Sequence, residues 1–167
     1  SLDQVNPDKY VEDPDHPAYN NLGAGVRQAD KEAENLSTNK QSFVWDTTAS
    51  NPKKVKELVS KGYDVYMVMV YTHPMISYIN NFSRKRNVPS VAVFSTWRNV
   101  YQLIGEYDKM LKGNLSIFVN DRGGKYKSEV EAFDTAAKNG PAGIKDYLQN
   151  YNEKNGVGGS TFFKPVV

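Results

Sequence analysis

Residues 43–71, FVWDTTASNPKKVKELVSKGYDVYMVMVY, constrain the fold more than any other part of the chain, because they predict a strand, a helix and a strand in succession. Residues 43–45 are a short run of β-formers. Residues 64–71 form an almost continuous apolar run, which is typical of a strand covered on both faces of a parallel sheet. A unit of about 30 residues matches a right-handed crossover between parallel strands.

The helix inside this unit is predicted from the helical spacing of its apolar residues and from the signals at its ends. Pro52 suits the first turn, where its missing N–H costs nothing. Either Asn51 or Ser50 can cap the helix. Gly62 suits the position just after its last turn. The sequence therefore predicts a helix that begins near Pro52 and ends at Gly62.

Composition excludes several classes of protein. The 167 residues suit one domain, and 39% hydrophobic with 24% charged residues is ordinary for a globular protein. There is no cysteine, which excludes disulfides, cysteine-zinc sites and thiol chemistry. A net charge of +2 is too small to indicate nucleic acid or a membrane surface as the partner. No apolar run reaches the length of a membrane span, so no span is predicted. The absence of cysteine fits a cytoplasmic protein, which is our expectation.

The remaining elements are predicted from the same signals. Helices are expected over residues 22–36, 75–85, 91–111 (or from 95), 127–138 and 141–151, strands over 2–5 and 115–119, and loops over 11–20 and 152–167. The first strand begins abruptly, so we expect the natural protein to start further upstream or to have been cut. The pattern indicates an α/β fold with a mostly parallel sheet and flanking helices.

Polar side chains follow two of these strands. Asp46, Thr47 and Thr48 come directly after one, and Asp8 follows the strand that ends near Val5. In open parallel sheets ligands bind beyond the carboxyl ends of the strands. A carboxylate there can take a proton from a hydroxyl group or hold magnesium. Alternatively, each aspartate caps the following helix, and the threonines are plain turn residues.

Three cations, Arg84, Lys85 and Arg86, follow the helix predicted over residues 75–85. Guanidinium groups pair with phosphate in bidentate fashion and neutralise developing charge, so these residues could close on a transferring phosphate. Alternatively, they form a solvated helix end that suits the helix dipole. The two histidines, His16 and His73, are too far apart in sequence to make a metal motif, and no metal site is predicted.

A phosphate-binding loop G-x-x-x-x-G-K-S/T does not occur in the sequence. Residues 156–161 carry glycines, serine and threonine but lack the lysine. No strand leads into them. We interpret this stretch as part of a flexible tail.

Several short segments, in consistent order over residues 3–121, resemble the zeta-toxin-like branch of the P-loop kinases, a family common in phages and bacteria. They are Val5-Asn6-Pro7-Asp8, His16-Pro17-Ala18-Tyr19, Asp46-Thr47-Thr48, Gly62-Tyr63-Asp64-Val65, residues 80–89 and Val119-Asn120-Asp121. The resemblance implies a doubly wound α/β fold whose first strand and phosphate loop would precede residue 1. The kinase-like core would cover residues 1–126, and a helical extension with a flexible tail would cover residues 127–167.

The resemblance also implies an activity, the ATP- and magnesium-dependent transfer of a phosphoryl group to a hydroxyl of a nucleotide or sugar nucleotide. Asp8 matches the aspartate that acts on the acceptor hydroxyl. Asp46, Thr47 and Thr48 match the polar strand end near the substrate. This activity would make the chain part of a small kinase.

The nucleotide would be held by Arg84 and Arg86, which match two arginines of the family's lid, and by Asn120 at a further strand end. The family often has another arginine where this chain has Asn80. Phosphoryl transfer depends on positioning and charge neutralisation. Without the amides and lysine of a phosphate loop, we expect residues 1–167 alone not to turn over ATP.

Two other interpretations remain open. The chain could be a non-catalytic kinase-like module for binding or assembly, for example in a phage particle, with a protein partner at a sheet edge left open by the missing strand. That module would not bind ATP. The resemblance could also be accidental, in which case the chain is an unrelated α/β domain.

Overall fold

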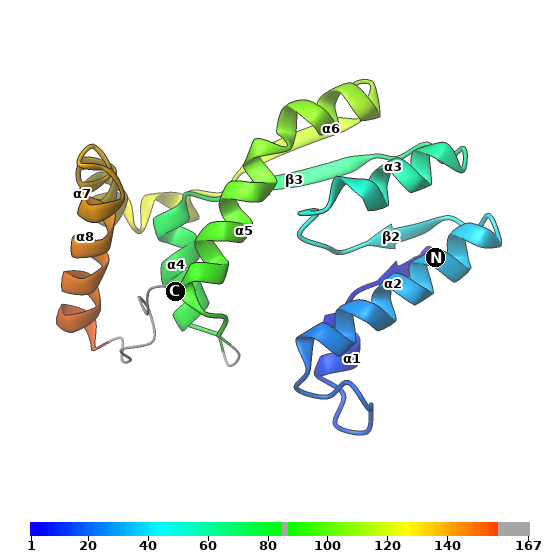
Figure 1. Cartoon of the computed structure of the whole chain (residues 1–167), viewed down its shortest axis with the longest axis horizontal. Helices are drawn as coiled ribbons and strands as arrows, with labels where there is room; N and C mark the ends of the chain where they lie inside the picture. The colour runs from blue at the N-terminus through cyan, green and yellow to red at the C-terminus, as the bar shows by residue number, and fades with distance from the viewer. Residues whose placement is uncertain (85–86, 157–167) are drawn as a thin grey trace. The chain divides into compact units, whose positions relative to one another are not determined.

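Two pairs of parallel strands organise the chain, one in each of its two units (Figure 1). The computed structural model describes residues 1–84 and 87–156. Unit 1 is Ser1–Val65, and unit 2 contains the described residues from Tyr66 onward. The predictions for Lys85, Arg86 and the tail over residues 157–167 lie outside the described residues.

Unit 1 is built on a short parallel pair of strands. Its elements are β1 (Asp3–Val5), α1 (Asp8–Val11), α2 (Leu22–Thr38), β2 (Phe43–Trp45) and α3 (Pro52–Ser60). In the pair, Val5 lies opposite Trp45. Val5 packs with Ala29 and Ala33 in the core, where the small alanine side chains let α2 lie close to the strands.

The ends of α3 follow the signals in the sequence. Asn51 caps the helix, because its side chain accepts the N–H of Lys53 at 3.1 Å. Pro52 lies in the first turn, and Gly62 adopts a positive φ of 86°. The prediction for this helix is confirmed, with Asn51 rather than Ser50 as the cap. The single-turn helix α1 was not predicted.

Gly25 lets α2 pack against α1. A Cβ at this position would lie 2.5 Å from Val11 Cγ1 and 3.1 Å from the carbonyl oxygen of Pro7, whereas a Cβ at Gly23 meets nothing closer than 3.5 Å. We expect Gly25→Ala to lower the free energy of unfolding by about 1–3 kcal/mol through overpacking. The control Gly23→Ala should be neutral or stabilising by up to about 1 kcal/mol. Urea unfolding of both variants measures this, and equal effects would contradict the packing argument.

Unit 2 contains the second parallel pair and most of the helices. Its elements are β3 (Met67–Tyr71), α4 (Pro74–Phe82), α5 (Ser90–Gln102), α6 (Ile104–Leu111), β4 (Leu115–Val119), a 3-10 turn η1 (Arg122–Gly124), α7 (Lys127–Ala137) and α8 (Gly140–Asn155). The helix predicted over residues 91–111 is divided at Leu103 into α5 and α6. Helix α8 continues to Asn155, further than predicted.

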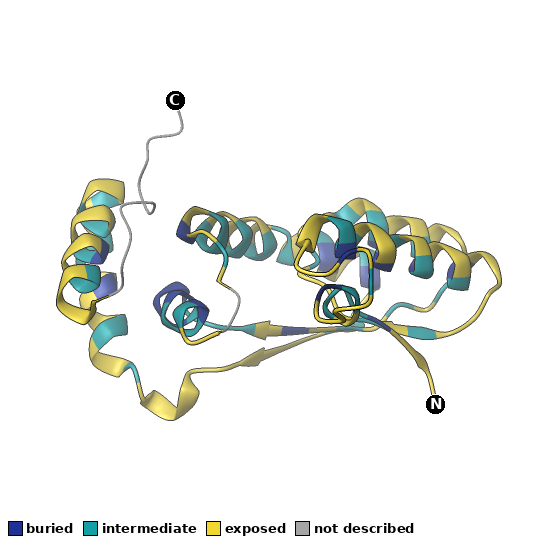
Figure 2. Cartoon of the chain, turned by 90° about the horizontal axis from the view of Figure 1, so that it is seen from below, coloured by how far each residue is buried: buried dark blue, intermediate teal, exposed yellow. Residues whose placement is uncertain are grey.

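The core of unit 2 joins the last two helices to α4. Met75 and Tyr78 of α4 cluster with Phe133 of α7 and Leu148 of α8, and all four are buried. Phe94 of α5 stacks on the Tyr78 ring with centroids 5.5 Å apart. In Figure 2 the dark blue of buried residues is prominent on α4, whereas α7 and α8, which overlap at the left of the view, are mostly yellow and teal. The residues after 127 therefore fold onto α4.

Only one face of β3 is covered, contrary to the expectation from its apolar sequence. Met69 is buried, and on the same face the Tyr71 ring packs against α5. On the other face Val68 is 67% and Val70 53% exposed, and Phe118, opposite Val70 in the register, is 59% exposed. Strand β3 is thus covered on one face only, and its partner β4 is mostly exposed.

The fold class is confirmed at the level of mixed α/β structure with parallel strands. The strand predicted over residues 64–71 begins later, at Met67. The crossover from β2 to β3 and the doubly wound sheet remain predictions, because β2 and β3 belong to different units. Over the part of the chain that the structure describes, no helix has both the length and the apolar character of a membrane span.

Candidate functional site

The carboxyl ends of β1 and β2 bring Asp8 and Asp46 to the same edge of the sheet in unit 1. The N–H of Asp46 donates to the carbonyl of Val5 at 2.9 Å. The Asn6 side chain donates to Asp46 Oδ2 at 3.3 Å and accepts the N–H of Asp8 at 2.9 Å. Asn6 therefore links the two aspartates. The sequence did not predict this link.

Asp46 does not cap the helix that follows it. Asn51 fills that position on α3, and the Asp46 carboxylate accepts from Asn6 at an exposed strand end. Asp8 is the first residue of α1, whose N-cap is Pro7. The helix dipole favours a carboxylate in the first turn of a helix. Asp8 can therefore have a purely structural role, the stabilisation of α1. The capping interpretation is excluded for Asp46.

Among the residues that the structure describes, the side chains of Thr47 and Thr48 bond only within their own turn. Thr47 Oγ1 accepts the N–H of Ala49 at 3.3 Å, and Thr48 Oγ1 donates to Ser50 Oγ at 3.2 Å. Ala49 has a positive φ of 52°. This geometry is that of turn residues, and a substrate contact by either threonine remains a prediction.

Helix α1, which carries Asp8, is tied to α2 through Glu32. Lys9 Nζ lies 2.6 Å from Glu32 Oε2, and the Tyr10 hydroxyl donates to the same carboxylate. Burial alone would raise the pKa of Glu32, but the bonds from Lys9 and Tyr10 outweigh it and lower this pKa below its ordinary 4.5. The ionised carboxylate is therefore the form that holds α1.

This ion pair predicts a pH dependence for unfolding. Since the pKa of Glu32 is lower in the folded chain, its contribution is complete above its unfolded pKa and is lost as the pH falls through the folded pKa. We expect Glu32→Gln to lower stability near neutral pH and to have a smaller effect below about pH 4. Urea midpoints measured across this range test the expectation, and a constant effect of the substitution would contradict it.

In unit 2, the segment that carries Arg84 is closed by Asn81. The Asn81 side chain donates to the carbonyl of Val88 at 2.8 Å and accepts the N–H of Val88 at 3.0 Å. Asn81 is buried, at 6% exposed. Asn81 follows Tyr78 by three residues on the apolar face of α4. A polar residue among apolar ones on a helix face is the sequence signal that could have revealed the role of Asn81. Arg84 itself is exposed.

Asn120 follows β4 at the strand end. Its Oδ1 accepts the N–H of Arg122 at 3.1 Å. A contact of Asn120 with a nucleotide remains a prediction, as does the lid role of Arg84.

His73 is a helix cap and a bridge between helices. Its Nδ1 accepts the N–H of Met75 at 3.1 Å, so in the neutral ring Nε2 carries the proton and can donate to Asp134 at 2.9 Å. Among the described residues, no group of three or more histidine, aspartate or glutamate side chains could hold a metal ion.

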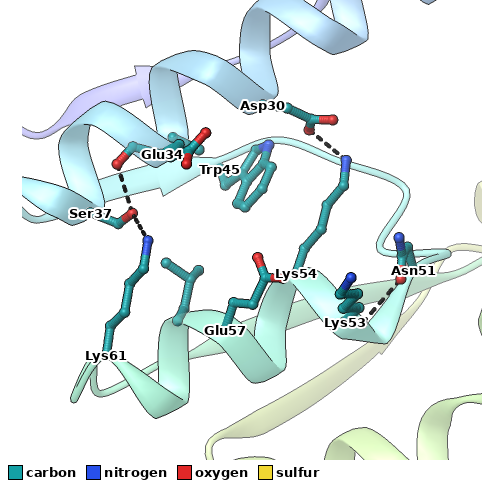
Figure 3. A pocket seen from close by; sticks show the side chains of 11 residues that line it. Asp30, Glu34, Ser37, Trp45, Asn51, Lys53, Lys54, Glu57 and Lys61 are labelled. Atoms are coloured by element: carbon teal, nitrogen blue, oxygen red, sulfur yellow. Dashed lines mark hydrogen bonds and ion pairs between the residues drawn. The ribbon is translucent and has the colours of Figure 1, made fainter.

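A hollow of about 300 Å³ lies between α2 and α3 in unit 1 (Figure 3). Lys54 reaches Asp30 across it and lies over the Trp45 ring, 5.5 Å from the centroid. Lys61 donates to Ser37 Oγ at 2.8 Å. The lining has three lysines and three carboxylates and includes none of the predicted site residues. These balanced charges do not favour an anionic ligand.

The predicted site residues thus fall into two sets. Asp8 and Asp46 lie together in unit 1, whereas Arg84 and Asn120 belong to unit 2. Their union in one site remains a prediction. Comparison with known proteins found no match to a family model, a curated protein or a solved structure.

Proposed function

We propose that this chain is part of a zeta-toxin-like P-loop kinase, which transfers a phosphoryl group from ATP to a hydroxyl of a nucleotide or sugar nucleotide in the cytoplasm. The observation that carries the proposal is the link from Asn6 to Asp8 and Asp46 at the ends of parallel strands. This edge is where ligands bind in open parallel sheets. In the proposed kinase, both strand pairs belong to one doubly wound sheet.

Within this proposal, Asp8 takes the proton of the acceptor hydroxyl, and Asp46, oriented by Asn6, accepts hydrogen bonds from the acceptor. Arg84 and Arg86 neutralise charge on the phosphates. When bound, ATP would supply the phosphoryl group and magnesium would supply part of the charge neutralisation.

The carboxylates of unit 1 are suitable ligands for the magnesium ion that a kinase requires. Mg²⁺ keeps several waters and binds through one or two carboxylates together with substrate phosphates, rather than in a cage of protein ligands. Asp46 offers such a carboxylate at an exposed strand end.

The test is a phosphotransfer assay with ATP labelled in its γ-phosphate. The protein is the natural one that contains this chain, with whatever its gene encodes before Ser1. We expect magnesium-dependent transfer of label to a nucleotide or sugar nucleotide. Absence of transfer to any of a panel of such acceptors, with ATP hydrolysis also absent, would contradict the proposal.

The uncovered face of β3 favours a second function, a non-catalytic kinase-like module that binds another protein. Val68, Val70 and Phe118 are all more than half exposed. Contiguous exposed apolar residues of this kind often mark interaction sites. The two functions differ in ATP binding by the natural protein, which calorimetry measures: the kinase binds ATP, and the module does not.

A further inference from the structure

The guanidinium group of Arg122 reaches the last turn of α4. Arg122 Nη2 lies 3.4 Å from Asn80 Oδ1, and Asn80 precedes Arg84 by one helical turn in sequence. Arg122 comes from η1, directly after β4, so a cation from a distant part of unit 2 lies beside the segment of the predicted lid. Asn80, which Arg122 contacts, occupies the position where the kinase family that the chain resembles often has an arginine.

The local structure holds Arg122 in an uncommon conformation. Its φ is +57°, and Gly123 and Gly124 follow with positive φ as well. Asn120 Oδ1 accepts the N–H of Arg122, and Asp121 Oδ1 accepts the N–H of Gly123 at 2.8 Å. Left-handed backbone is unfavourable for a residue other than glycine, because its Cβ comes too close to the following carbonyl oxygen. Retention of such strain is frequent at ligand-binding sites.

The segment beside Arg122 is also fixed. Asn81 bonds both backbone groups of Val88, as described above. With its amide oriented to satisfy both neighbours, the side-chain nitrogen of Asn87 donates to the carbonyl of Arg84 at 2.9 Å. The backbone at Arg84 is therefore held close to the end of α4.

The charges of both arginines are available to an anion. No carboxylate within residues 1–84 and 87–156 forms an ion pair with either Arg84 or Arg122. Two guanidinium groups attached to fixed backbone can each offer paired N–H donors to phosphate oxygens.

We propose that Arg122 binds the phosphate chain of a nucleoside triphosphate together with Arg84, and so supplies the cation that Asn80 does not. The inference rests on the proposed kinase function and adds a residue to its nucleotide site. Asn120 then acts through Arg122 as a positioning residue, because it holds the Arg122 amide.

The test is isothermal titration of the 167-residue chain with inorganic tripolyphosphate at low ionic strength. We expect Arg122→Gln and Arg84→Gln each to weaken binding about tenfold or more, since a hydrogen bond to a charged group contributes roughly 1.5–3 kcal/mol. Arg122→Lys should lie between wild type and Arg122→Gln, because lysine keeps the charge but loses the fork. Arg98→Gln, an exposed arginine of α5, is the matched control and should change binding less than about twofold.

Two results would overturn the inference in different ways. If Arg84→Gln weakens binding and Arg122→Gln does not, Arg122 is not part of the site, and the proposed function is unaffected. If the wild-type chain does not bind tripolyphosphate, the inference fails, and the proposed function depends on the phosphotransfer assay alone. Circular dichroism of each variant shows whether the fold is kept.

Discussion

Replacement of Asp8 by asparagine is expected to reduce phosphoryl transfer by the natural protein about 10²–10⁴-fold, the usual contribution of a general base. Asparagine keeps the size of the side chain and the backbone bond to Asn6, but it cannot take the proton of the acceptor hydroxyl. ATP binding should be unchanged, because Asp8 is assigned to the acceptor. Steady-state transfer rates and calorimetric ATP binding measure the two effects separately.

Asp3→Asn is the matched control for Asp8→Asn. Asp3 is exposed at the start of β1, at the opposite end of the strand from the site. The Asp3→Asn variant should therefore transfer phosphoryl groups at the wild-type rate. If Asp8→Asn also keeps the wild-type rate, Asp8 is not the base. Its role would then be the favourable placement of a carboxylate in the first turn of α1, with a loss of roughly 0.3–1 kcal/mol in stability.

Removal of the Tyr78 ring is expected to have the largest effect on stability. The ring is fully buried, at 0% exposed, and contacts Phe82 and Phe94 with centroids 4.9 Å and 5.5 Å away. Its hydroxyl donates to Asn152 Oδ1 at 2.7 Å, which joins α4 to α8. Tyr78→Ala should lower the free energy of unfolding by about 3–5 kcal/mol, as large aromatic truncations in cores do. Urea unfolding followed by circular dichroism measures this loss.

Two variants separate the contributions of Tyr78. Tyr78→Phe keeps the ring and removes the hydroxyl, which should cost about 0.5–1.5 kcal/mol. Tyr66→Ala removes a tyrosine ring that is 75% exposed and should change stability by less than about 0.5 kcal/mol. A loss for Tyr78→Ala no greater than that for Tyr66→Ala would show that the α4–α8 cluster does not stabilise the chain.

Local signals predicted helix α3 and strand β4 well. The ends of α3 depend on Asn51, Pro52 and Gly62, which act on their immediate neighbours. The strand over residues 115–119 has the predicted bounds. Each of these elements is encoded by a few adjacent residues, and no distant partner is needed to fix its ends.

The predicted first residue of β3 was wrong, because the start of this strand depends on its partner β4. Met67 pairs with Leu115, the first residue of β4. Lys112 and Gly113, just before β4, have positive φ and form the turn out of α6. Val65 and Tyr66, just before Met67, have side chains that suit a strand, but β4 begins at Leu115 and does not extend far enough to pair with them.

The candidate site could be predicted only in part, for the same reason. Asp46 at a strand end follows from the pattern of one strand. The link through Asn6 needs the register that places Val5 opposite Trp45, 40 residues away, and a single strand does not reveal it. Likewise, the contact between Arg122 and Asn80 depends on how β4 and α4 lie in unit 2.

The uncovered face of β3 bears on how the chain behaves at high concentration. Val68, Val70 and Phe118 form an exposed apolar strip on this face. Sulfate and similar salts strengthen apolar association, so they should promote clustering of the chain through this strip. Any segment or binding partner that covers the strip would raise the solubility of the chain. Polar replacements at Val68 and Val70 would have the same effect.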